Sequence, residues 1–201
     1  LMVHHVLESR VESRVIDGAL TCIARVGVAK TTLDDVAREA GCARATVYRY
    51  YPGKQPLLHA VVVRETDRLT ALVIRAADAE DDLAAAATAV LTNGAEFLLG
   101  HTALRCVLAV EPEVLLPHIS FARGDVMLAV CASRLAPAFT RFVEPDRARR
   151  LSEWLVRFGM SYLCSEQATE LLERDRVRAL VDDFVLPGID RPVLSEGTIP
   201  S

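Results

Sequence analysis

Apolar residues along this chain recur every three or four positions and do not alternate with polar ones. That spacing gathers apolar side chains on one face of a helix, whereas a half-buried strand requires strict alternation. No convincing strand or hairpin-turn pattern interrupts it. We therefore predict an all-α fold. A chain of 201 residues can build a substantial core and lies at the border between one and two domains.

The N-terminal quarter carries two short helices joined by a glycine. Thr32 followed by Asp35 is the start of a capped helix, which Gly41 ends after barely two turns. A second helix spans about residues 43–50, and Pro52 breaks the chain after it. Two helices so short and so close together predict a helix-turn-helix.

Longer helices flank this pair. The first spans about residues 8–26 and stops at Gly27, a residue that readily takes a positive φ. The second spans about residues 53–76 and tolerates Pro56 because no backbone donor is needed in its first turn. This register places Lys54 at the start of the long helix.

The rest of the chain reads as further helices separated by polar or proline-containing breaks. Pro137 is expected to kink one of them, and the pair 187–188 to end the folded part. We divide the chain into a helix-turn-helix domain at 8–53, a larger helical body at 54–187, and a flexible tail at 188–201. The predicted helices lie at about 83–100, 103–110, 114–121, 125–142, 146–164 and 170–186.

Charge is distributed unevenly along the chain, whose formal net charge is -4. Residues 8–55 hold eight Lys and Arg against six Asp and Glu, which is net +2, whereas the remainder holds fifteen against twenty-one, which is net -6. Because an acidic surface repels a polyanion, any nucleic acid should bind the N-terminal part.

The sequence gives no sign of a metal, redox or membrane site. The five cysteines are scattered and include no CxxC pair, so we expect reduced thiols, no metal and no cofactor. No uninterrupted apolar run reaches the roughly 18 residues of a membrane span, and the N-terminus lacks a signal pattern. These features predict a cytoplasmic protein without membrane contact.

The helix at 43–50 is too polar on one face to be buried and too aromatic for an ordinary solvated surface. A helix in the major groove needs side chains near its start for base edges and longer donors at its margins for phosphates. A core edge with its hydroxyls in water would have a similar composition, but the neighbouring cap, glycine turn and lysine favour DNA binding. Val47 and Tyr51 are expected in the core. The predicted DNA-contacting residues are Thr32, Arg44, Ala45, Thr46, Tyr48, Arg49, Tyr50 and Lys54.

The stretch TTLDDVAREAGCARATVYRYYPGK, with one helix before it and a helical body after it, resembles the N-terminal domain of TetR-family transcriptional regulators. It departs from the family's common pattern at Ala43, often Ser, at Ala45, often Gly, and at Tyr51, usually Phe. The helix at 43–50 should therefore lack a side-chain N-cap. The resemblance implies a ligand-responsive regulator, most often a repressor, which binds a pseudo-palindromic operator as a homodimer and is released by a small effector.

The resemblance also implies a small-molecule pocket in each body. An apolar lining would suit an apolar or amphipathic effector, with His101 as a polar exception able to orient a polar group. Each of these residues could also be ordinary core. The candidate lining residues are Phe97, Leu98, His101, Cys106, Phe121, Met127, Cys131, Trp154 and Phe158.

The last two helices carry more apolar residues than they can bury against one small body. We expect them to pair with their counterparts across a twofold axis, and the resemblance implies that the four helices together form the interface. The predicted interface residues are Leu151, Leu155, Phe158, Tyr162, Val177, Leu180, Val181 and Phe184.

Two other classes of function stay open at this point. A helical interaction module could use the same apolar faces for a different partner and never bind DNA. A small helical enzyme would need a nucleophile beside a base and an orienting group, and no such arrangement is readable around His101 or Cys106.

Overall fold

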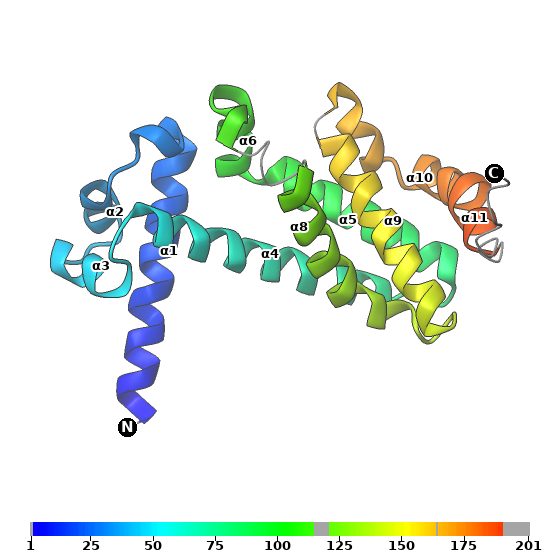
Figure 1. Ribbon diagram of the computed structural model, residues 1–201, viewed down its shortest axis with the longest axis horizontal. Coiled ribbons are helices and arrows are strands. Elements are labelled where there is room, and N and C mark those ends of the chain that lie inside the picture. Colours follow the sequence, from blue (N-terminus) through cyan, green and yellow to red (C-terminus); the bar gives the residue numbers. More distant parts are fainter. Residues whose placement is uncertain (1, 115–120, 164, 191–201) are drawn as a thin grey trace, which may run out of the picture. The chain divides into compact units, whose positions relative to one another are not determined.

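The computed structural model describes residues 2–114, 121–163 and 165–190, and within these ranges it contains helices and turns but no strand (Figure 1). The predicted all-α fold is confirmed. The chain divides into two compact units, each built from two segments. The first unit comprises Leu1–Leu69 and Phe97–Met127, and the second comprises Thr70–Glu96 and Leu128–Ser201.

The first unit contains the predicted helix-turn-helix. Its N-terminal elements are α1 (Met2–Lys30), α2 (Leu33–Glu39), α3 (Arg44–Tyr50) and the beginning of α4 (Lys54–Asp78). Helix α6 (Thr102–Val110) joins them from later in the chain.

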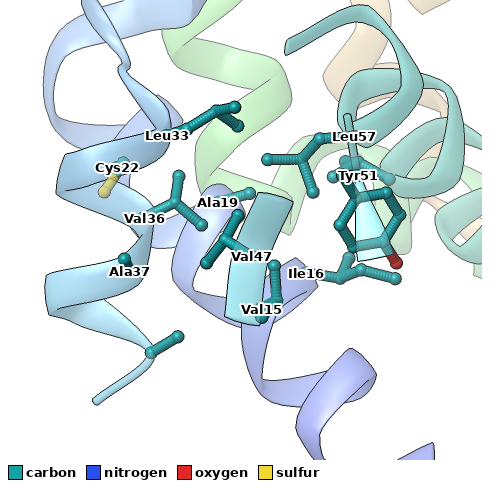
Figure 2. Packing of buried hydrophobic residues seen from close by; sticks show 12 residues of the cluster. Val15, Ile16, Ala19, Cys22, Leu33, Val36, Ala37, Val47, Tyr51 and Leu57 are labelled. Atoms are coloured by element: carbon teal, nitrogen blue, oxygen red, sulfur yellow. The ribbon is translucent and has the colours of Figure 1, made fainter. Parts of the chain in front are cut away.

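The side chains of α1 to α4 in this unit converge on one apolar cluster (Figure 2). Gly18 allows α1 to approach α2 closely, because a Cβ there would lie 3.1 Å from the backbone of Val36 and Ala40. The Arg14 guanidinium donates to the carbonyls of Ala40 and Gly41 and so caps the end of α2. The cluster consists of Val15, Ile16, Ala19, Cys22, Leu33, Val36, Ala37, Ala40, Val47, Tyr51, Leu57 and Val61.

Two glycines make the turns that the sequence predicted. Gly27 has a φ of 81° and interrupts α1, after which one more helical turn reaches Lys30. Gly41 has a φ of 60° and separates α2 from α3. Thr32 caps α2 with its side chain, whereas Ala43 offers α3 no side-chain cap.

The second unit is built from the end of α4, most of α5 (Leu83–Gly100) and the C-terminal helices. Arg141 fixes the break after α4 by donating to the carbonyls of Ala77 at 2.8 Å and Glu80 at 2.5 Å. The remaining elements are α8 (Phe121–Leu135), a 3-10 turn at Ala136–Phe139, α9 (Pro145–Leu163), a 3-10 segment at Glu166–Leu172, α10 (Arg174–Leu180), a π turn at Val181–Val185 and α11 (Leu186–Asp190).

Several predicted helix boundaries in the C-terminal half are wrong. The helix expected at 125–142 starts earlier, at Phe121, and runs through Gly124. It ends at Leu135, because Pro137 is accommodated in a 3-10 turn. The helix expected at 170–186 starts only at Arg174, after the 3-10 segment. Pro187 does not end the helical part, because the backbone continues from the π turn at Val181–Val185 directly into α11. Most of the helix expected at 114–121, and residues 191–201 of the expected tail, lie outside the described residues.

Helix α5 corrects the expectation that no segment has the length and composition of a membrane span. Its 18 residues Leu83–Gly100 have a mean hydropathy of 1.3, because Glu96 is the one charged residue among them. Of that stretch, 44% is buried inside the fold, and the residues from Ala86 to Leu91 are buried without interruption. Burial on every side is the environment of a central core helix.

Candidate nucleic-acid interface

Helix α3 has one buried side and one exposed side. Val47, at 0% exposure, and Tyr51, at 5%, pack into the cluster of the first unit, as predicted. The other side chains of the helix point away from this cluster or lie at its edge. Of the predicted DNA-contacting residues, Thr32, Arg44, Ala45, Tyr48 and Arg49 are exposed, and Thr46, Tyr50 and Lys54 are half-buried.

Arg44 is held in place by two neighbours. Its Nε lies 2.9 Å from Oδ1 of Asp34 on α2, and its Nη2 donates to the Tyr48 hydroxyl at 3.2 Å. The guanidinium carbon also lies over the Tyr48 ring, 5.1 Å from its centroid. The hydrogen bond to Tyr48 and the charge of Asp34 raise the pKa of Arg44 above its ordinary value, so Arg44 presents a fixed positive charge.

Arg49 makes a similar pair with the neighbouring phenol. Its Nη2 lies 3.4 Å from the Tyr50 hydroxyl, and its guanidinium carbon lies 5.1 Å from the centroid of the Tyr50 ring. The exposed side of α3 therefore presents two arginines, each stacked on a tyrosine. Guanidinium groups and phenols are the donors that proteins use on base edges and phosphates.

The Thr32 hydroxyl caps the N-terminus of α2. Its Oγ1 accepts from the Asp35 amide at 3.2 Å and donates to the Asp35 carboxylate at 2.5 Å. Arg38 completes the group with an ion pair to Asp35 at 3.0 Å. The hydrogen bond from Thr32 is the main cause of a lowered pKa at Asp35, whose carboxylate thus stays ionised. The cap fixes where α2 begins and hence where α3 lies.

Lys54 and Glu111 meet on the same short segment of α1. Lys54 Nζ donates to the carbonyl of Ala29 at 2.9 Å. The Glu111 carboxylate, at the end of α6, accepts from the amides of Val28 at 2.7 Å and Ala29 at 3.0 Å. Sequence reasoning missed Glu111, because it lies more than 80 residues from its partners and belongs to no motif.

His101 begins α6 and was predicted as a pocket residue. Its Nδ1 accepts from the Leu104 amide at 3.1 Å, and its Nε2 lies 3.4 Å from Glu65 on α4. Glu65 also pairs with Arg64 at 3.1 Å and with Arg68 at 3.0 Å. His101 is thus a helix cap within a charged group of the first unit.

The other predicted pocket residues fall in both units. Trp154 and Phe158 of α9 stack on each other, with their ring centroids 4.8 Å apart. Burial raises the pKa of the Cys131 thiol, so the thiol stays protonated. Phe121 lies at the start of α8, and its side chain is outside the described residues. The half-buried members are Phe97, Leu98, His101, Cys106 and Met127 in the first unit and Cys131, Trp154 and Phe158 in the second.

The predicted interface residues separate into two groups. Leu151, Leu155, Val177 and Val181 have exposures of 0–2% within the single chain, so they form its core and offer no free surface. Phe158, Tyr162 and Leu180 are half-buried, and Phe184 is 69% exposed. The rings of Phe158 and Tyr162 continue the aromatic row of α9, with centroids 4.7 Å apart.

A helix-turn-helix on its own apolar core, with arginines and phenols on the exposed side of its second helix, defines a DNA-binding protein. Comparison with known proteins shows which kind of DNA-binding protein this chain resembles. Residues 15–61 match the family model for bacterial regulatory proteins of the tetR family. An uncharacterized HTH-type transcriptional regulator of Mycobacterium tuberculosis is 28% identical over 178 residues, which are 87% of this chain and 83% of the relative.

Solved structures show the same fold at low sequence identity. The TetR family repressor AlkX from Dietzia sp., implicated in biodegradation of n-alkanes, has a TM-score of 0.65 at 16% identity, over 85% of this chain and 93% of its own. The regulator FadR from Bacillus subtilis, in complex with stearoyl-CoA, has a TM-score of 0.62 at 16% identity, over 84% and 96%.

Residues 15–61 thus match the DNA-binding domain of the TetR family, and the comparisons support a TetR-family transcriptional regulator. The protein is a DNA-binding regulator and not an enzyme, which removes the two other classes left open by the sequence. Within the described part of the chain, no three His, Cys, Asp or Glu side chains are grouped so that they could hold a metal.

Proposed function

We propose that this protein is a repressor that binds a pseudo-palindromic operator as a homodimer and releases it when a small apolar or amphipathic effector binds. The observation that supports this most strongly is the exposed side of α3. There Arg44 and Arg49 are each stacked on a tyrosine, while Val47 anchors the helix in the core. In this arrangement α3 enters the major groove, Arg44 reads base edges, and Lys54 meets a phosphate.

The proposed dimer uses the exposed remainder of the two C-terminal helices. Phe184 exposes 69% of its surface on the π turn, and Tyr162 and Phe158 are half-buried on α9. Large aromatic side chains at an exposed surface are characteristic of protein interfaces. Leu151, Leu155, Val177 and Val181 support this surface from within the subunit.

The proposed effector is apolar or amphipathic. The half-buried candidates in the two units are largely aromatic and aliphatic, with His101 and two cysteines as the polar groups. FadR is bound to stearoyl-CoA, and AlkX is implicated in n-alkane biodegradation, so long-chain acyl compounds and alkanes are the first chemical classes to try. Side chains of this kind bind a hydrocarbon chain through the apolar area that the contact buries.

Operator binding is tested by selecting duplexes from a random-sequence library with the wild-type protein. The affinity for the selected duplex is then measured by fluorescence anisotropy across a salt series. The proposal predicts enrichment of an inverted repeat with half-sites about one helical turn apart, and affinity that falls as salt rises. No enriched sequence and no salt-dependent binding would refute it.

The proposed class of effector is tested by screening fatty acids, acyl-CoA esters and n-alkanes for compounds that raise the melting temperature of the protein. A stabilising compound is then titrated with and without the selected duplex. Because coupling is reciprocal, the duplex should weaken effector binding by the factor by which the effector weakens duplex binding. Equal effector affinity in the two titrations would show that the compound does not control release.

A further inference from the structure

Glu111 is a charged residue in a buried position. The residue is 8% exposed, and both carboxylate oxygens face backbone amides of α1. Oε2 accepts from the Val28 amide at 2.7 Å, and the Ala29 amide lies 3.0 Å from Oε1 and 3.1 Å from Oε2. A carboxylate is costly to bury unless its oxygens are hydrogen-bonded, so this position is tolerated because these amides satisfy it.

The amides are available because α1 is interrupted at Gly27. With a φ of 81° and a ψ of 175°, Gly27 ends the regular hydrogen-bonding pattern. The turn that follows has amides without a carbonyl partner in the preceding turn, and Glu111 caps them from another helix. Gly27 also makes room for the carboxylate, since a Cβ there would lie 2.7 Å from Oε1 of Glu111.

Apolar contacts bring the two helices together beside this carboxylate. Ile23 of α1 packs with Ala103 and Val107 of α6 in a second buried cluster of the same unit. Val28 and Val114 pack against that cluster from its edge. Glu111 is therefore placed by the packing of α6 and not by a flexible loop.

Ala29 is held from two sides. Its amide donates to Glu111, and its carbonyl accepts from Lys54 Nζ at 2.9 Å. A lysine ammonium has three donors, so one bond to Ala29 leaves two for a phosphate oxygen. A lysine held in this way also loses less side-chain freedom when a phosphate arrives.

We propose that Glu111 is a positioning residue for DNA binding, which fixes Ala29 so that its carbonyl holds the Lys54 ammonium at the start of α4. This inference rests on the proposed function, in which Lys54 contacts a phosphate. It extends the DNA-binding unit beyond the family motif at 15–61 to the end of α6. A displacement of α6 must either carry Ala29 with it or break these hydrogen bonds.

The first test measures the affinity of wild type, Glu111→Gln, Lys54→Ala and the double variant for the duplex selected by wild type. Glutamine keeps the shape but places an amide where two backbone donors converge. We expect Glu111→Gln to lower affinity about tenfold, as for the loss of one charge-assisted hydrogen bond. In the Lys54→Ala background the same change should have almost no further effect, because the residue it positions is gone.

Glu113→Gln is the matched control. It makes the same change of charge two residues away, at an exposed position, and should leave affinity unchanged. The inference is overturned if Glu111→Gln binds as wild type does, or if it lowers affinity equally with and without Lys54. A purely structural role for Glu111 would give the second of these results.

A second measurement does not depend on Glu111 variants folding. Lys54 is half-buried but is not part of the apolar cluster of the first unit, so Lys54→Ala should fold. Amide hydrogen exchange at Val28 and Ala29 can then be compared between this variant and wild type. Because coupling is reciprocal, loss of Lys54 should speed exchange of these two amides severalfold. Unchanged exchange would overturn the inference. Absence of any duplex binding by wild type would instead refute the proposed function, while the exchange result would still decide the link between Glu111 and Lys54.

Discussion

Asp34 shows how a single acidic side chain can serve a DNA-binding surface. Its carboxylate holds Nε of Arg44 at 2.9 Å, while Nη2 of the same guanidinium donates to the Tyr48 hydroxyl, so the two contacts together orient Arg44. Removing a negative charge near DNA should by itself strengthen binding to every sequence. We expect Asp34→Asn to do this for scrambled duplexes but to lower the preference for the selected duplex by about three- to tenfold, because Arg44 is no longer oriented.

The control for Asp34 is Glu39→Gln, which removes a charge from the other end of α2. Glu39 pairs with Arg25 at 2.9 Å and does not reach α3. Anisotropy titrations with both duplexes would give the preference of each variant. Identical preferences for Asp34→Asn and Glu39→Gln would show that Asp34 contributes charge alone.

Tyr51 should make the free energy of unfolding depend on pH in the alkaline range. Burial and the nearby Glu12 carboxylate, 3.3 Å from the hydroxyl, raise the pKa of Tyr51 to about 12. The raised pKa means that the folded protein favours the neutral phenol over the ionised one. The contribution of Tyr51 to the free energy of unfolding is therefore complete below pH 10 and is lost as pH rises towards 12. Denaturant unfolding should show a loss of about 1–3 kcal/mol over that range. Tyr51→Phe should remove this part of the pH dependence, and an unchanged profile would contradict the assignment.

At the scale of elements, the break in α1 depends on Gly27. Alanine there would have to adopt a φ of 81° and would place its Cβ 2.7 Å from the Glu111 carboxylate. We expect Gly27→Ala to lower the free energy of unfolding by about 1–3 kcal/mol. Gly94→Ala is the control, because a Cβ in the middle of α5 would meet its nearest neighbour, Val73, at 3.7 Å. Denaturant unfolding would contradict this account if both variants were equally stable.

Local signals in the sequence predicted most of the N-terminal unit. The Thr32 cap, the glycines at 27 and 41 and Pro52 mark boundaries that depend on neighbouring residues alone, and the structure agrees with them. The partners of Arg44 and Lys54 were not predictable in this way. Asp34 lies on the preceding helix and Glu111 lies on α6, so both contacts exist only after the helices have packed.

The C-terminal boundaries were harder because several conformations suit the same residues there. Pro137 is compatible with a kinked α-helix or a 3-10 turn, and Pro187 with a helix end or a helix start. Periodicity also could not separate a stripe that faces the subunit's own core from one that faces a partner. Leu151 and Leu155 belong to the first kind, whereas Phe184 is exposed.

At the scale of the whole molecule, the proposed dimer depends on exposed side chains. Phe184→Glu changes a side chain that is 69% exposed, so the subunit should fold and the dimer should dissociate. Val126→Glu, at a side chain of α8 that is 65% exposed, is the matched control and should leave the dimer intact. Leu155→Glu, at 2% exposure, should instead unfold the subunit. Sedimentation at micromolar concentration would contradict the assignment if wild type were a monomer or if Phe184→Glu stayed a dimer.

The claim on which the rest depends is that α3 reads DNA while Lys54 binds its backbone. It is tested by measuring the affinities of wild type, Arg44→Ala and Lys54→Ala for the selected and scrambled duplexes across a salt series. Arg44→Ala should lose about 1–3 kcal/mol of preference for the selected duplex. Lys54→Ala should weaken both duplexes alike and reduce the slope of log affinity against log salt by about one. If both variants bound both duplexes as wild type does, the assignment of α3 and Lys54 to the DNA surface would be wrong.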